Sequence, residues 1–62
     1  MNKQEEANLF MVKYLKKALD NDEVESDYDQ KFISNAYFRV TKGMELSDKQ
    51  QKYLEECFHN KY

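Results

Sequence analysis

The near absence of helix-breaking residues is the feature that most constrains this chain. It has no proline and one glycine, Gly43, and these two residue types disfavour a helix interior most strongly. Apolar side chains recur three and four positions apart, which is the spacing of a helix with one buried face. The sequence therefore predicts an all-α fold with helices at about 3–20, 28–41 and 48–60.

A residue whose side chain can cap a helix precedes each predicted helix. These residues are Asn2 for the first helix, Ser26 or Asp27 for the second, and Ser47 for the third. Gln50 follows Ser47 at the position that completes a capping box. Gly43 follows the second helix, where a left-handed backbone conformation is easiest for a residue without a Cβ atom.

Each predicted helix has an apolar stripe that can face a shared core. The stripe of the first helix comprises Ala7, Phe10, Met11, Tyr14, Leu15, Ala18 and Leu19. The other two stripes comprise Phe32, Ile33, Ala36 and Val40, with Tyr37 at the margin, and Tyr53, Leu54, Cys57 and Phe58. Leu46 and Met44 are expected to cover the end of the bundle. An acidic linker at 20–27 and a shorter glycine turn join the helices, which predicts a small three-helix bundle as one domain over 1–62.

Charge is distributed unevenly, although the net charge is only −2. The stretch 20–29 holds six acidic residues and no base, whereas residues 1–19 and 30–62 are each net positive. This balance argues against a general polyanion binder and against a protein that imitates DNA. The acidic stretch is not an EF-hand, because the positions that need glycine and glutamate hold Glu25 and Lys31. It is interpreted as a solvated linker.

No set of residues for catalysis, for a metal or for a cofactor stands out. Cys57 is the only cysteine and His59 the only histidine. Side chains two positions apart on a helix point in different directions, so this pair cannot chelate one metal ion well. Cys57 is expected to be a buried, inert thiol and His59 to be exposed. We therefore predict a protein that is not an enzyme.

No apolar run is long enough to span a bilayer, and the first ten residues lack the apolar core of a signal peptide. The single cysteine allows no internal disulfide, which fits a reducing compartment. A cytoplasmic protein without a membrane partner is expected.

Phe38 points away from the apolar stripe of its helix. Tyr37, Lys31 and Arg39 are near it in the helical projection, and aromatic residues beside arginine are enriched at protein contact sites. We predict that these four residues bind another protein. The alternatives are that Phe38 packs beneath the N-terminal segment or against a second copy in a homodimer.

Lys13, Lys16 and Lys17 form a basic face on the first helix. Such a face can contact phosphates, which supports the alternative of a nucleic-acid-associated accessory protein. The same lysines are also typical of a solvated helix face. A helix–turn–helix interpretation is disfavoured, because Asp48 and Glu55 place acids on the helix that would enter the DNA groove.

The stretch 32–58 has an aromatic-rich helix, a glycine, the pattern Leu-Ser-x-Lys-Gln and a second amphipathic helix. The matching residues are Phe32, Ile33, Gly43, Leu46, Ser47, Lys49, Gln50 and Leu54. In these features the segment, under half of the chain, resembles small early bacteriophage proteins that bind and redirect host machinery or assist phage DNA metabolism. The resemblance implies a modulator or inhibitor of a host or phage enzyme, acting in the host cytoplasm. Such proteins often have a zinc-binding cysteine cluster, which this chain lacks, and this departure argues against a nucleic-acid role. The expected function is a non-catalytic protein-binding module.

Overall fold

The computed structural model describes residues 2–62 and contains three α-helices. Helix α1 spans Lys3–Asp20, α2 spans Asp27–Thr41 and α3 spans Asp48–Glu56, and one π-helical turn, η1, follows over Cys57–Lys61. No strand occurs within residues 2–62. The predicted all-α three-helix bundle is therefore confirmed, and each helix begins within one residue of its predicted start.

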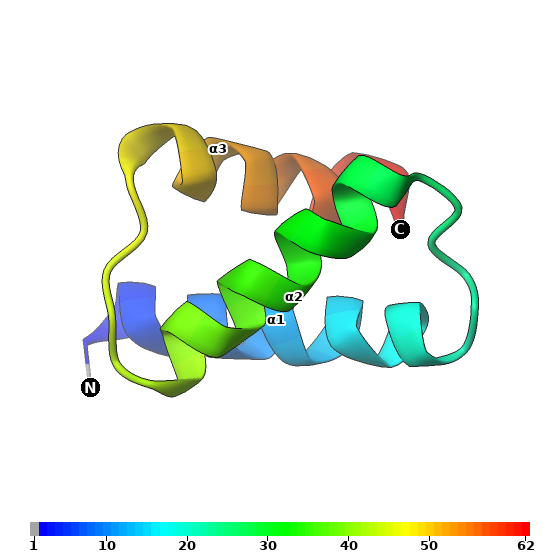
Figure 1. Ribbon diagram of the computed structural model, residues 1–62. Helices are drawn as coiled ribbons and strands as arrows, with labels where there is room; N and C mark the ends of the chain where they lie inside the picture. The colour runs from blue at the N-terminus through cyan, green and yellow to red at the C-terminus, as the bar shows by residue number, and fades with distance from the viewer. Residues whose placement is uncertain (1) are drawn as a thin grey trace.

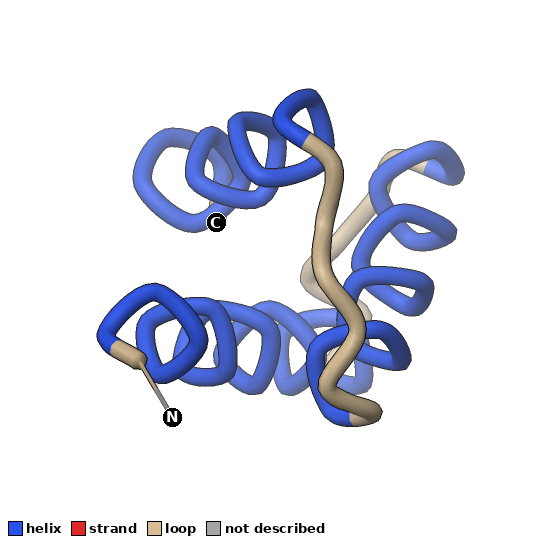
Figure 2. The backbone as a smooth tube through the Cα atoms, turned by 90° about the vertical axis from the view of Figure 1, so that its left-hand side faces the viewer, coloured by secondary structure: helices blue, strands red, loops and turns tan. Residues whose placement is uncertain are grey.

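Helix α2 crosses the other two helices and packs against both. Figure 1 shows α1 and α3 at opposite edges of the molecule, with α2 running diagonally in front of them. In the perpendicular view of Figure 2, α2 forms one side of the molecule by itself, while α1 and α3 form the other. One long side of α2 therefore faces solvent along the whole helix.

Side-chain caps hold the predicted helix starts in place. The Ser47 hydroxyl accepts a hydrogen bond of 3.2 Å from the Gln50 amide, and the Gln50 side chain accepts one of 2.9 Å from the Ser47 amide. Asn2 and Ser26 cap α1 and α2 by accepting from the third residue of each helix. Gly43 has a φ of +77°, the left-handed conformation predicted for the turn after α2.

The core lies where the three helices meet. Its fully buried apolar side chains come from all three: Val12 and Leu15 from α1, Ile33 from α2, and Leu54 followed by Cys57 from α3 and η1. Val24 is also buried, and it anchors the linker between α1 and α2 to the core. The sequence interpretation of this linker as purely solvated missed that anchor.

The predicted stripe of α1 is wrong on one side. Ala7, Phe10 and Tyr14 are exposed, and Asn8 and Val12 are buried in their place. The predicted stripe spans an arc of about 180° around the axis of α1, at 100° per residue. The two neighbouring helices cover a smaller arc than this. The bundle buries the half of the arc that faces α2 and α3, and leaves the other half at the surface.

The C-terminal part of the third predicted helix is also corrected. The α-helical pattern ends at Glu56, and in the π turn the Tyr62 amide donates a 2.9 Å hydrogen bond to the Cys57 carbonyl. This wider turn brings the last two residues of the chain against the beginning of α2. Of the two residues expected to cover the end of the bundle, Leu46 packs against the core but Met44 is 47% exposed.

Candidate functional site

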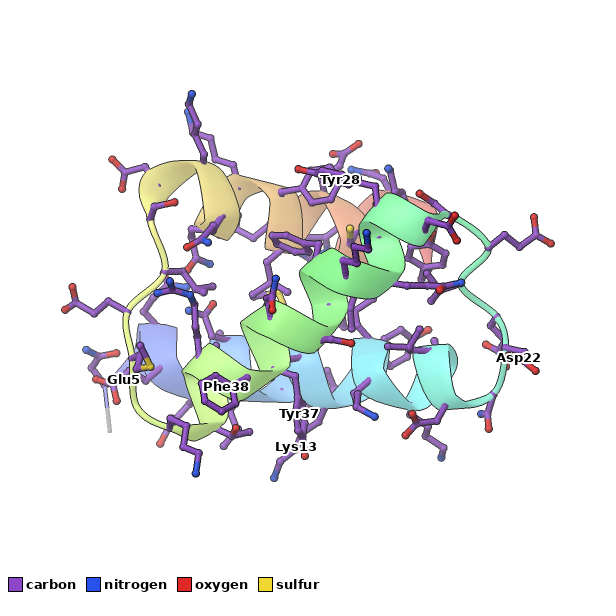
Figure 3. All side chains as sticks on the ribbon, in the orientation of Figure 1. Glu5, Lys13, Asp22, Tyr28, Tyr37 and Phe38 are labelled. Carbon is purple, nitrogen blue, oxygen red and sulfur yellow. The ribbon has the colours of Figure 1, made fainter. Side chains whose placement is uncertain are left out.

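The outer face of α2 is the strongest candidate for a contact surface. We use this name for the exposed residues that follow one side of the helix at spacings of three and four. They are Asp27, Lys31, Ser34, Asn35, Phe38 and Lys42. Phe38 is the large apolar residue among them and is 56% exposed. Figure 3 shows its ring on the front of α2, away from the other helices.

The neighbours of Phe38 differ in part from those predicted. Lys42, one turn further along, places its ammonium group 5.8 Å from the centre of the Phe38 ring. Arg39 and Met44 line a hollow of about 320 Å³ with Phe38. Because Lys42 lies four residues after Phe38, helical spacing alone was the signal that could have identified it.

Lys31 lies on the same face as Phe38 but lines a different hollow, and Tyr37 lies against the core. Lys31 lies two helical turns from Phe38 and lines a separate hollow with Leu19 and Ser34. Tyr37 is half-buried against the core, and the Lys16 ammonium group lies 5.8 Å from its ring centre. Of the four predicted contact residues, the structure therefore brings only Phe38 and Arg39 together.

Within residues 2–62, two of the three lysines on the predicted basic face of α1 form no ion pair. Lys13 and Lys17 are exposed, and Figure 3 shows Lys13 on the same side as Tyr37. Lys16 instead forms an ion pair of 2.7 Å with Asp20. This pair neutralises one of the three charges that a phosphate would have met.

A second exposed aromatic group lies between α1 and η1. The centre of the Phe58 ring lies 5.8 Å from that of Phe10 and 5.2 Å from that of Tyr14, and both pairs pack edge to face. Phe10 is 65% exposed and Tyr14 is 47% exposed. Sequence analysis assigned these rings to the core, and the breadth of the apolar arc on α1 was the signal that it missed.

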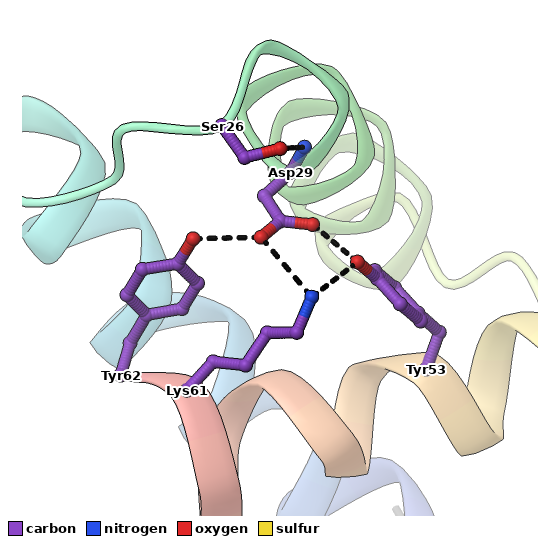
Figure 4. A network of polar contacts seen from close by, with 5 residues as sticks. All are labelled: Ser26, Asp29, Tyr53, Lys61 and Tyr62. Carbon is purple, nitrogen blue, oxygen red and sulfur yellow. Dashed lines mark hydrogen bonds and ion pairs between the residues drawn. The ribbon is translucent and has the colours of Figure 1, made fainter.

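A buried carboxylate joins the beginning of α2 to the C-terminal turn, as Figure 4 shows. Asp29 is 2% exposed. Its oxygens accept hydrogen bonds from the Tyr53 hydroxyl and, at 2.6 Å, from the Tyr62 hydroxyl. The Lys61 ammonium group lies 3.5 Å from the same carboxylate and donates a 2.8 Å hydrogen bond to the Tyr53 hydroxyl oxygen.

These contacts keep the Asp29 network in one protonation state near neutral pH. Burial raises the pKa of Asp29, but two phenol hydrogen bonds and the charge of Lys61 outweigh it, so the pKa lies below 3.8. The hydrogen bond to Asp29 raises the pKa of Tyr62 to about 12 and also raises that of Tyr53. The network therefore links the beginning of α2 to α3 and to the C-terminal turn through hydrogen bonds within the molecule.

A smaller amide network joins α1 to α3. The Asn8 and Gln51 side chains exchange two hydrogen bonds of 2.8 Å, and Gln51 also donates to Glu55. Both amides line a cleft of about 550 Å³ beneath the α2–α3 loop. Within residues 2–62, every buried side-chain nitrogen and oxygen has a hydrogen-bond partner. The Asn8 and Gln51 amides of this cleft thus already have partners within the fold.

The only cysteine and the only histidine of the chain lie in different environments. Cys57 is fully buried, as predicted, and burial raises the pKa of its thiol to about 11. His59 is exposed, as predicted, with its ring 5.0 Å from that of Phe58. No group of three metal-binding side chains lies within residues 2–62. None of the helices in that range is both long and apolar enough to cross a membrane.

The outer face of α2 therefore combines an exposed aromatic ring with adjacent cations on one side of a helix. No family model, curated protein or solved structure matches this chain.

Proposed function

We propose that this domain is a non-catalytic protein-binding module whose contact surface is the outer face of α2. The observation that carries the proposal is the position of Phe38, more than half exposed on a helix whose other side supplies Ile33 and Ala36 to the core. Burying an aromatic side chain of this size contributes about 1.5–3 kcal/mol relative to leaving it in water. Because just over half of Phe38 is exposed, a partner that covers it would gain about half of that energy without any change in this fold.

The cations around the ring support the same proposal. Arg39 and Lys42 flank Phe38, and an apolar centre with a charged border is the usual composition of a protein contact. The modulator or inhibitor role that the phage resemblance implies is one form such binding would take.

Capture from a cell extract tests this function. Immobilised wild-type protein and the variant Phe38→Ala are compared, and any captured protein is titrated against both. We expect Phe38→Ala to weaken binding about tenfold or more, the range for an aromatic contact residue. Phe10→Ala is the matched control, because Phe10 is a similarly exposed ring on another face. Equal losses from both variants, or none from Phe38→Ala, would contradict the proposal.

Nucleic-acid binding through α1 is the weaker proposal. Lys13 and Lys17 are exposed, but Lys16 is paired with Asp20. Lys13 and Lys17 form no ion pair within residues 2–62. Two such cations would release about two counterions, so binding would be weak and would decrease only slightly with salt. A titration with single- and double-stranded DNA at low salt tests it, with Lys13→Gln as the variant, and absence of binding there would exclude this role.

A further inference from the structure

The two ends of the outer face of α2 carry opposite charges. Asp27 lies at the N-terminal end, with Glu25 just before it, and Lys42 lies at the C-terminal end beside Arg39. Among residues 2–62, no ion pair involves any of these four. The ends are about 22 Å apart at 1.5 Å per residue, more than twice the screening distance of about 8 Å in physiological salt. One chain therefore cannot neutralise these charges with each other.

The middle of the same face carries short, polar side chains. Ser34 and Asn35 are the exposed residues there, and their short side chains allow a second helix to approach to about 8–10 Å between axes. Figure 2 shows that α2 forms this side of the molecule alone, so a helix laid along it meets α2 first. Along the helix, Lys31 precedes these two residues and Phe38 follows them.

An antiparallel second copy of α2 complements this pattern. When the twofold axis passes between Ser34 and Asn35, Asp27 of each copy lies opposite Lys42 of the other. The same register places Lys31 of each copy opposite Phe38 of the other, where an ammonium group can lie over an aromatic ring. Antiparallel helices also place opposite dipole ends together. Each favourable contact occurs twice, as a twofold contact requires.

We propose that the partner on the outer face of α2 is a second copy of this chain, bound antiparallel through Asp27, Lys31, Phe38 and Lys42. This inference rests on the proposed function, since it takes that face to be a protein contact and names its occupant. One helix face is a small interface, so the dimer forms in a concentration-dependent equilibrium.

Sedimentation of the wild-type chain over a wide range of concentration, with two charge variants, tests the dimer. Asp27→Lys and Lys42→Glu each replace two attractive pairs by two repulsive ones in their own dimers. We expect each variant alone to dimerise about tenfold more weakly than wild type. In an equimolar mixture, every pair is again between opposite charges, so association should return to near the wild-type level. Recovery on mixing also shows that both variants are folded.

Matched controls separate the contact from effects on the helix itself. Glu6→Lys removes an acid from the first turn of α1, as Asp27→Lys does for α2, and Lys17→Glu changes a base in the last turn of α1. These two controls should dimerise like wild type. A loss in the controls equal to that in the α2 variants would overturn the proposal.

Three further outcomes would overturn the dimer. They are a wild-type chain that stays monomeric at every concentration, a mixture of variants that does not associate, and a mass that grows beyond that of two chains. If the chain stays monomeric but Phe38→Ala still loses a captured protein, the proposed function stands and only the choice of partner fails. If Phe38→Ala changes neither dimerisation nor capture, both fail.

Discussion

The charged groups at the two ends of α2 differ in burial: Asp29 is buried, whereas Lys42 is exposed. Asp29, near the start of the helix, is buried and accepts hydrogen bonds from three donors, in α3, in η1 and in Tyr62 directly after η1. The Phe38–Lys42 region, at the other end, leaves its aromatic ring and its cation at the surface. Both regions combine an aromatic ring with a lysine. Only at Asp29 are these side chains joined to a buried acceptor within the molecule. The difference shows which polar contacts maintain the fold and which remain for a partner.

The contrast extends to residues two positions apart. Asp27 and Asp29 both lie in the first turn of α2, yet Asp27 is exposed and Asp29 is buried. A buried carboxylate stabilises a fold only when donors replace the water it has lost, whereas an exposed one keeps its water. Substitutions at the two positions should therefore differ strongly in effect.

The largest effect is expected from Asp29→Ala. Removing the carboxylate leaves the Tyr53 and Tyr62 hydroxyls without their acceptor, and a hydrogen bond to a charged group contributes about 1.5–3 kcal/mol. A domain of this size has only a few kcal/mol of total stability, so the variant should be largely unfolded. Urea denaturation followed by circular dichroism measures this. Asp27→Ala is the matched control and should lower the free energy of unfolding by less than about 1 kcal/mol.

Phe32→Ala should have the next largest effect. Phe32 is half-buried on α2, with its ring 4.8 Å from that of Tyr53. Loss of this contact and its buried area should lower the free energy of unfolding by about 2 kcal/mol, less than for a fully buried ring. Denaturation midpoints of Phe32→Ala and wild type at one temperature give the value. An effect below that of Phe38→Ala would reverse the assignment of these two rings.

Raising the pH into the alkaline range should lower the stability that the Asp29 network contributes to the fold. The pKa of Tyr62 is raised from 10.0 to about 12. Its contribution to stability is therefore complete below pH 10, the unfolded value, and is lost as the pH rises through about 12. Tyr62→Phe should remove part of this pH dependence, which urea midpoints at several alkaline pH values can measure. Cys57, with a pKa raised to about 11, contributes in the same direction, so the comparison includes Cys57→Ala. Identical pH dependence in wild type and Tyr62→Phe would show that the phenol is not coupled to Asp29.

The smallest effect on stability is expected from Phe38→Ala. An exposed aromatic residue contributes little to folding, so the free energy of unfolding should change by no more than about 0.5 kcal/mol. Far-ultraviolet circular dichroism and thermal denaturation would check this. A loss as large as that of Phe32→Ala would place Phe38 in the core and remove the contact surface on which the proposed function depends.

Local patterns of the sequence determined the helices and part of the candidate site. Capping by Ser47 and Gln50, the left-handed Gly43, and apolar spacing depend on residues within a turn or two of each other, so they can be recognised without the fold. The same local geometry correctly directed Phe38 away from the core and Cys57 into it. A helical projection shows the direction of a side chain on its own helix, and for these two residues that was sufficient.

Contacts between helices decided the rest. Whether Phe10 and Tyr14 are buried depends on how much of α1 the other helices cover. The burial of Asp29 depends on Tyr53, Lys61 and Tyr62, which lie 24, 32 and 33 residues away along the chain. The sequence by itself thus determined where the helices lie and which way most residues point, because those properties arise from neighbouring residues. Only the tertiary structure decided which polar groups are satisfied within the molecule, because that requires partners distant in the chain to be brought together.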